Sequence, residues 1–158
     1  QTCALPIMRE LLVPQTTVLT PNSLEARRLA SGDDEDPDMA LPLADCASRL
    51  LGLGCEYVLI TGTHEGTPQV INTLFGEGGD VQAEVWDRLP GSYHGSGCTL
   101  ASAIAAFLAS GMEVGKAVRE AQEYTWHALA AGFRPGMSQF IPDRFFWARD
   151  QDEGEEKT

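Results

Sequence analysis

Apolar residues follow two patterns along the chain, helical spacing and short continuous runs. Residues 41–51 and 114–131 each carry an apolar stripe at helical spacing, which predicts amphipathic helices. Residues 17–20 and 57–61 are short, mostly β-branched or apolar runs without polar alternation, as is typical of strands covered on both faces. A short helix is predicted between these strands, over residues 23–30.

The order of the remaining elements defines the fold class. Residues 70–75 and 81–86 flank a glycine-rich segment, which predicts a β-hairpin, and a helix is predicted over 97–109. Residues 8–13 indicate the end of a helix stopped by Pro14, and the aromatic segment 140–147 is expected to close the domain. Strands and helices in this order predict an α/β fold, in which sites form at the carboxyl ends of strands.

Composition and charge exclude some classes of partner. The 158 residues are 43% hydrophobic and 22% charged, which is ordinary for one soluble domain with its own core. The formal net charge of −12 argues against a nucleic-acid partner, because phosphate backbones are bound by basic surfaces. No apolar run is long enough to span a bilayer, so we expect no membrane partner.

The four cysteines, Cys3, Cys46, Cys55 and Cys98, show no Cys-x-x-Cys spacing, and no histidine pair completes a zinc site. Cys46 and Cys55 are expected to fill the core of a reduced protein. We therefore expect a cytoplasmic location.

Domain boundaries follow from local composition. Residues 1–7 lack an initiator Met and resemble non-native sequence, so we expect a leader there and a fragment whose upstream part is missing. The acidic run 33–36 and the acidic tail 148–158 are expected to be solvated or disordered. Residues 8–147 are then the C-terminal part of a single domain.

The strongest candidate site is the turn His94-Gly95-Ser96-Gly97-Cys98, followed at once by a helix-forming run. Glycines permit a tight turn, and the backbone N–H groups at a helix start favour an anion such as phosphate. Cys98 falls in the first turn, where this field makes thiolate more available. A plain glycine-rich helix start with a structural cysteine is the alternative.

Residues 94–100 (His-Gly-Ser-Gly-Cys-Thr-Leu) resemble the anion-hole signature of hydroxymethylpyrimidine/phosphomethylpyrimidine kinases, members of the ribokinase-like superfamily. Upstream, residues 19–26 resemble the family's strand-end Thr-Pro-Asn and contain the superfamily's Asn-x-x-Glu. The resemblance runs from about residue 11 to about residue 147. It implies a three-layer α/β/α ribokinase-like sheet, truncated here at the N-terminus.

The resemblance also implies a reaction. The expected activity is phosphorylation of 4-amino-5-hydroxymethyl-2-methylpyrimidine and its monophosphate in thiamine biosynthesis, with ATP and Mg²⁺. The amides of Gly95, Ser96, Gly97 and Cys98 would hold the phosphoryl group, and the Cys98 sulfur would accept the acceptor's proton. No Gly-x-x-x-x-Gly-Lys-Ser/Thr loop is present, so a P-loop enzyme is excluded.

Two further pairs of residues are implicated by the resemblance. Asn22 and Glu25 would organise Mg²⁺, through water, although capping of the following helix explains the same spacing. Thr61 and Gly62 would contact the nucleotide phosphates. Many family members carry Lys-Gly-Gly-His where this chain has Thr61-Gly62-Thr63-His64, so a cation near the triphosphate is missing.

Two alternatives stay open. One is pyridoxal kinase of a subgroup that carries cysteine in the position of Cys98. The other is a catalytically inert nucleotide-binding fragment, because the family's pyrimidine pocket lies mostly on the part that precedes this sequence. Family members are often dimers, which leaves a homodimer open for the full-length form.

Overall fold

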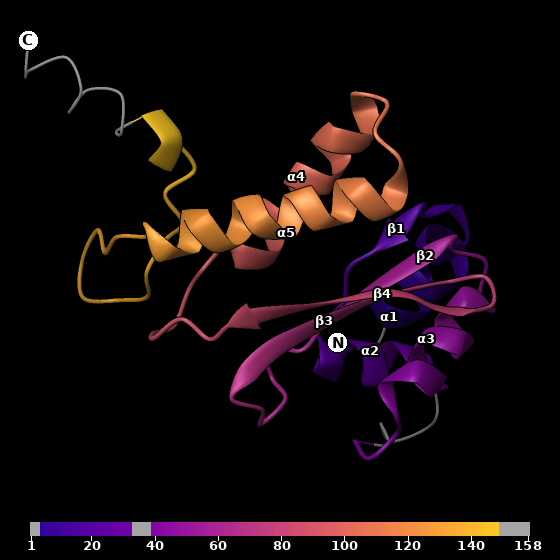
Figure 1. Ribbon diagram of the computed structural model, residues 1–158. Coiled ribbons are helices and arrows are strands. Elements are labelled where there is room, and N and C mark those ends of the chain that lie inside the picture. The colour runs from indigo at the N-terminus through magenta and orange to yellow at the C-terminus, as the bar shows by residue number, and fades with distance from the viewer. Residues whose placement is uncertain (1–3, 33–38, 149–158) are drawn as a thin grey trace, which may run out of the picture. The chain divides into compact units, whose positions relative to one another are not determined.

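Strands and helices follow the predicted order, as Figure 1 shows. The computed structural model describes residues 4–32 and 39–148, and these fall into two units, 1–88 and 89–158, each described by itself. The elements of the first unit are α1 (Ala4–Ile7), η1 (Met8–Leu12), η2 (Val13–Gln15), β1 (Val18–Leu19), α2 (Ser23–Ala30), α3 (Leu43–Leu51), β2 (Tyr57–Thr61), β3 (Gln69–Gly76) and β4 (Gly79–Asp87). The second unit contains α4 (Ser96–Ala109) and α5 (Val114–Ala130).

The first unit is built on a mixed sheet in the order β1-β2-β3-β4. β1 and β2 are parallel, whereas β2–β3 and β3–β4 are antiparallel. The predicted hairpin is therefore confirmed, and it is longer than the 70–75 and 81–86 segments. The α/β class is confirmed as well.

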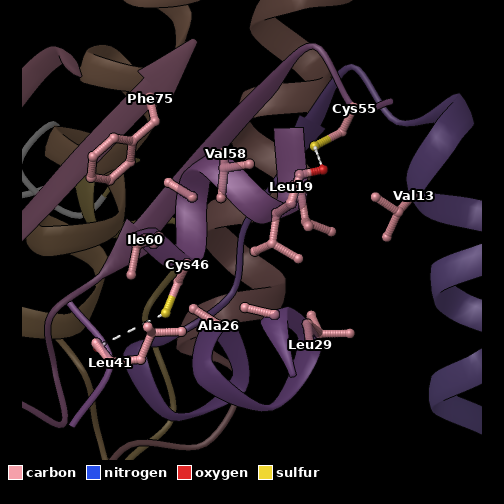
Figure 2. Packing of buried hydrophobic residues seen from close by; sticks show 13 residues of the cluster. Val13, Leu19, Ala26, Leu29, Leu41, Cys46, Cys55, Val58, Ile60 and Phe75 are labelled. Carbon is pink, nitrogen blue, oxygen red and sulfur yellow. Dashed lines mark hydrogen bonds between the residues drawn. The ribbon is translucent and has the colours of Figure 1, made fainter. Parts of the chain in front are cut away.

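One face of this sheet carries the core shown in Figure 2. Leu29 of α2 and Leu50 of α3 are buried together with Val58 and Ile60 of β2, which point to the same side of the strand. Full burial of each of these side chains contributes about 1.5–3 kcal/mol. The sheet is thus held against α2 and α3 by apolar contact.

Cys46 and Cys55 fill this core as predicted. Their thiols contact the carbonyl oxygens of Leu41 and Leu50, at 4.0 and 3.3 Å (Figure 2). Burial raises the pKa of both thiols, because the charged thiolate is poorly solvated there. Neither sulfur is therefore suited to act as a base at neutral pH.

Several boundaries differ from the prediction. The predicted helix end is a π-helix, Met8–Leu12, and the chain continues past Pro14 as the 3₁₀ turn Val13–Gln15. α3 begins at Leu43 rather than at residue 41, with Pro42 immediately before it. The acidic run 33–36 and residues 149–158 of the tail lie outside the described residues.

The second unit pairs two helices with a closing segment. The buried stripe of α5 confirms the predicted core face, whose buried members are Ala117, Val118, Ala121, Gln122, Thr125 and Ala128. The segment predicted to close the domain does so through β-bridges, which join Tyr93 to Phe140 and Phe133 to Ile141. The aromatic rings of Tyr93 and Phe140 also pack, with centroids 5.5 Å apart.

Candidate active site

The helix α4 begins at a left-handed glycine. Gly95 precedes the helix with φ 85° and ψ 10°, a conformation that costs an L-residue about 1–2 kcal/mol. No side chain among the described residues caps this end, in contrast to α2 and α5, which are capped by Asn22 and Glu113. The first N–H groups of a helix have no partner within the helix, so those at the start of α4 suit an anion.

A second interaction fixes the shape of this turn. The amide and the hydroxyl of Thr99 both donate to the Gly95 carbonyl oxygen, at 3.0 and 2.8 Å. Arg144 donates from Nε to the Thr99 hydroxyl at 3.1 Å, and its backbone carbonyl accepts from the Tyr124 hydroxyl at 2.9 Å. The guanidinium also lies against Gly95, because a Cβ added there would meet Arg144 Nη2 at 3.2 Å.

The residues before the turn are held by the closing segment. The amide of His94 donates to the Phe140 carbonyl at 2.8 Å, and the amide of Phe140 donates to the Ser92 carbonyl at 2.9 Å. The side chain of Gln139 donates to the Ser92 hydroxyl at 2.6 Å. The residues before the turn are therefore held by hydrogen bonds to residues about 45 positions further along the chain.

Cys98 lies in the first turn of α4 and is exposed. Gly97 beside it is also exposed, and a Cβ there would meet no atom within 4 Å. An exposed thiol at a helix start can meet a substrate, whereas the buried thiols of Cys46 and Cys55 cannot. Cys98 is therefore accessible at its surface, and its catalytic role stays a prediction.

Asn22 and Glu25 form a capping box at the start of α2. The Asn22 Oδ1 atom accepts from the amides of Leu24 and Glu25, at 3.0 and 2.9 Å. In return, Glu25 Oε2 accepts from the Asn22 amide at 2.9 Å. The capping explanation of this spacing is confirmed. It leaves room for a second role, because the Glu25 side chain is exposed and its Oε1 atom takes no part in the box.

Thr61 and Gly62 lie next to this cap. A parallel bridge joins Asn22 to Thr61, whose amide donates to the Pro21 carbonyl at 3.0 Å. The Gly62 amide donates to the side-chain Oδ1 of the buried Asn72 at 3.1 Å. A Cβ on Gly62 would lie 2.3 Å from the carbonyl oxygen of Ile71, so any other residue there would force the backbone of β3 to shift. The predicted magnesium and nucleotide residues therefore do meet at the carboxyl ends of β1 and β2.

The loop after Gly62 is tied to α2 by an ion pair. Arg27, 8% exposed, donates from Nη1 to Glu65 Oε1 at 2.8 Å and from Nε to the Leu41 carbonyl at 3.1 Å. Arg27 lowers the pKa of Glu65, chiefly through this hydrogen bond to the carboxylate. Sequence reasoning did not find the pair, because its members are 38 residues apart and neither stands in a motif.

Comparison with known proteins decides the family. A family model described as phosphomethylpyrimidine kinase matches residues 2–143. The chain belongs to the phosphomethylpyrimidine kinase family. It is 39% identical over 138 residues to a hydroxymethylpyrimidine/phosphomethylpyrimidine kinase of Streptomyces coelicolor, covering 84% of this chain and 48% of that protein.

Two other matches bear on the substrate. A pyridoxine kinase of Bacillus subtilis is 37% identical over 139 residues, covering 85% of this chain and 48% of that protein. The solved pyridoxal kinase of Staphylococcus aureus in complex with AMP-PCP matches with a TM-score of 0.80 at 26% identity, covering 92% of this chain and 53% of that one. The chain thus spans about half the length of these relatives, and the likeness confirms a ribokinase-like kinase fold.

Asn22 and Glu25 are the residues expected to bind Mg²⁺. Among residues 4–32 and 39–148, no group of three or more His, Cys, Asp or Glu side chains is placed to hold a metal ion. Mg²⁺ needs no such group, since it keeps several waters and takes one or two carboxylates besides substrate phosphates. The exposed carboxylate of Glu25 fits that kind of site. Asn22 fits it less directly, because its oxygen already accepts two amides.

The candidate residues form one group in each unit. Asn22, Glu25, Thr61 and Gly62 lie together in the first, and the turn from Gly95 to Cys98 lies in the second. Their meeting around one nucleotide stays a prediction. Sequence reasoning missed Asn72, which supports Gly62, and Arg144, which supports Gly95, because each acts across many residues of sequence. In the described part of the chain, no helix is both long and apolar enough to traverse a membrane.

Gly62→Ala tests the close approach of the backbone after β2. We expect a loss of about 3 kcal/mol in the free energy of unfolding, because the new methyl group would collide with the Ile71 carbonyl and displace β3. The matched control is Gly66→Ala in the same loop, where a Cβ meets nothing within 4 Å and stability should stay within about 1 kcal/mol. Equal urea midpoints for both variants would contradict the packing at Gly62.

Glu65→Gln tests the ion pair with Arg27. At pH 7 we expect Glu65→Gln to lower the free energy of unfolding by about 1–2 kcal/mol. The effect is modest because the Glu65 side chain is 33% exposed. The folded pKa of Glu65 is lowered, so its contribution is complete above the ordinary glutamate pKa of about 4.3 and disappears as the pH falls through the folded pKa.

The difference in unfolding free energy between wild type and Glu65→Gln should therefore be constant from about pH 6 to pH 8 and shrink below about pH 4.3. The exposed Glu56→Gln serves as the control and should show almost no difference at any of these pH values. If the difference in unfolding free energy between wild type and Glu65→Gln grew as the pH fell, it would contradict a stabilising ion pair between Arg27 and Glu65.

Proposed function

We propose that this protein transfers the γ-phosphoryl group of ATP to 4-amino-5-hydroxymethyl-2-methylpyrimidine and then to the resulting monophosphate, in thiamine biosynthesis. The observation that carries the proposal is the exposed Cys98 thiol in the first turn of a helix that starts, without a side-chain cap, at a left-handed glycine. Membership of the phosphomethylpyrimidine kinase family supports the same chemistry.

In the first step the hydroxymethyl oxygen attacks the γ-phosphorus. The new O–P bond forms as the bond from phosphorus to the β,γ-bridging oxygen breaks, and ADP leaves. The proton of the hydroxymethyl group passes to the Cys98 sulfur, which accepts it as the thiolate and becomes the thiol. The amides of Gly95, Ser96, Gly97 and Cys98 hold the oxygens of the migrating group, whose charge they stabilise.

ATP would be held chiefly by the ends of β1 and β2. Thr61 and the Gly62 turn offer a hydroxyl and a backbone in a fixed position, since Asn72 and Pro21 anchor both residues. The Glu25 carboxylate would contact a hydrated Mg²⁺, which neutralises the phosphates. The staphylococcal relative was solved with an ATP analogue, which supports ATP as the donor.

Pyridoxal kinase is the second candidate, favoured by the 37% identity to a pyridoxine kinase. A nucleotide-binding protein without catalytic activity is the third, because this chain spans about half the length of its relatives. We also infer a cytoplasmic protein, because the buried thiols of Cys46 and Cys55 are free, and we leave a homodimer as an expectation.

The test is a side-by-side assay with radiolabelled ATP and Mg²⁺ on hydroxymethylpyrimidine, its monophosphate and pyridoxal, together with thermal stabilisation of the 158-residue chain by ATP. Transfer to both pyrimidines supports the proposal, and preferential transfer to pyridoxal favours the second candidate. Stabilisation by ATP without transfer to any acceptor favours the third, and no stabilisation excludes nucleotide binding by this chain.

Cys98→Ala separates the two phosphorylation steps. We expect kcat/KM for hydroxymethylpyrimidine to fall about 100-fold, the effect of removing a general base, and that for the monophosphate to fall by less than about tenfold. The second acceptor is a phosphate already ionised at pH 7 and hardly needs a base. Ser102→Ala, exposed one turn further along α4, is the matched control and should leave both constants unchanged. Equal losses in both steps would reject the role of Cys98.

A further inference from the structure

Three backbone carbonyl groups of the loop after β2 converge on one side chain. Arg88, which follows the last residue of β4, donates from Nη1 to the Thr63 carbonyl oxygen at 2.8 Å. Its Nη2 atom donates to the Glu65 carbonyl at 3.0 Å, and its Nε atom donates to the Thr67 carbonyl at 3.3 Å. All three nitrogens of the guanidinium therefore bond to alternate residues of one short loop.

This convergence requires a cation of a particular shape. Three carbonyl oxygens turned toward one point repel each other unless a positive charge lies between them. The planar guanidinium offers donors in a fixed fork, so it meets three separate oxygens at once. A lysine ammonium carries the same charge but on a single atom, which cannot reach three oxygens in this arrangement.

The same loop is anchored on its other side. Arg27 of α2 holds the Glu65 carboxylate, with Nη1 to Oε1 at 2.8 Å and Nη2 to Oε2 at 3.4 Å. At the start of the loop, Asn72 of β3 accepts from the Gly62 amide. The loop is therefore fixed from three elements, α2, β3 and the end of β4.

We propose that Arg88 is a positioning residue for nucleotide binding: its guanidinium collects the carbonyl oxygens of Thr63, Glu65 and Thr67 and so keeps the loop after Thr61 and Gly62 in one conformation. The inference rests on the proposed function, in which Thr61 and Gly62 contact the phosphates. With Arg88 in place, three oxygens that would repel a triphosphate are paired with a positive charge. Without it, the loop samples several conformations and ATP must order it on binding.

The test combines two measurements on the 158-residue chain, with Arg88→Gln, Arg88→Lys and a control. Arg28→Gln is the control, since it makes the same charge change on the exposed face of α2. Hydrogen exchange reports on the loop without requiring activity, through the Glu65 amide, which donates to the Gly62 carbonyl at 3.0 Å. Titration with ATP and Mg²⁺ reports on nucleotide binding.

For Arg88→Gln we expect exchange of the Glu65 amide to rise about tenfold and the Kd for ATP to rise about tenfold, with exchange in β2 and β3 unchanged. Arg88→Lys should fall between wild type and Arg88→Gln in both measurements, because it keeps the charge and loses the fork. Arg28→Gln should stay within about twofold of wild type in both.

Two results would overturn the inference in different ways. Unchanged exchange in Arg88→Gln shows that the guanidinium does not order the loop. Faster exchange with the same ATP affinity as Arg28→Gln shows that the ordered loop serves the fold and not the nucleotide. If the wild-type chain itself fails to bind ATP, the proposed function fails for this chain and the nucleotide part of the inference with it, while the exchange data still decide whether Arg88 orders the loop.

Discussion

The left-handed backbone of Gly95 is the constraint on which the proposed chemistry depends. With φ at 85°, the chain turns into α4 in one step, and no described side chain takes up the amides at the helix start. The Thr99 and Arg144 contacts hold this geometry from the inside of the turn, which leaves Cys98 exposed on the outside. A helix start of this kind provides dipoles that need no reorganisation when a phosphoryl group arrives.

The first unit supplies a rigid frame of a different kind. Its residues are fixed by hydrogen bonds between elements: Asn22 to the start of α2, Asn72 to Gly62, and Arg27 to Glu65. The apolar contact of α2 and α3 with the sheet stabilises the frame but does not determine the positions of the loop atoms. The polar contacts do so, since each is directional and most are at least partly buried.

Local sequence determined some of these features and could not determine others. The helix Ser23–Ala30 and the strand Tyr57–Thr61 were predicted with their bounds, because capping residues, prolines and β-branched runs act within a few residues. The capping role of Asn22 and Glu25 was one of two predicted alternatives, and the core roles of Cys46 and Cys55 followed from composition. The contacts of Arg27, Arg88 and Arg144 span 38, about 25 and 45 residues, and no periodic pattern marks an arginine whose partner is a distant carbonyl or carboxylate.

The central claim is that the uncapped amides at the start of α4 bind the phosphates of a nucleotide. The most direct measurement is an amide ¹H–¹⁵N NMR titration of the chain with ATP and Mg²⁺. The account predicts that the signals of Ser96, Gly97 and Cys98 shift together along one binding curve as ATP is added. ATP binding that leaves the signals of these three amides unshifted would contradict it.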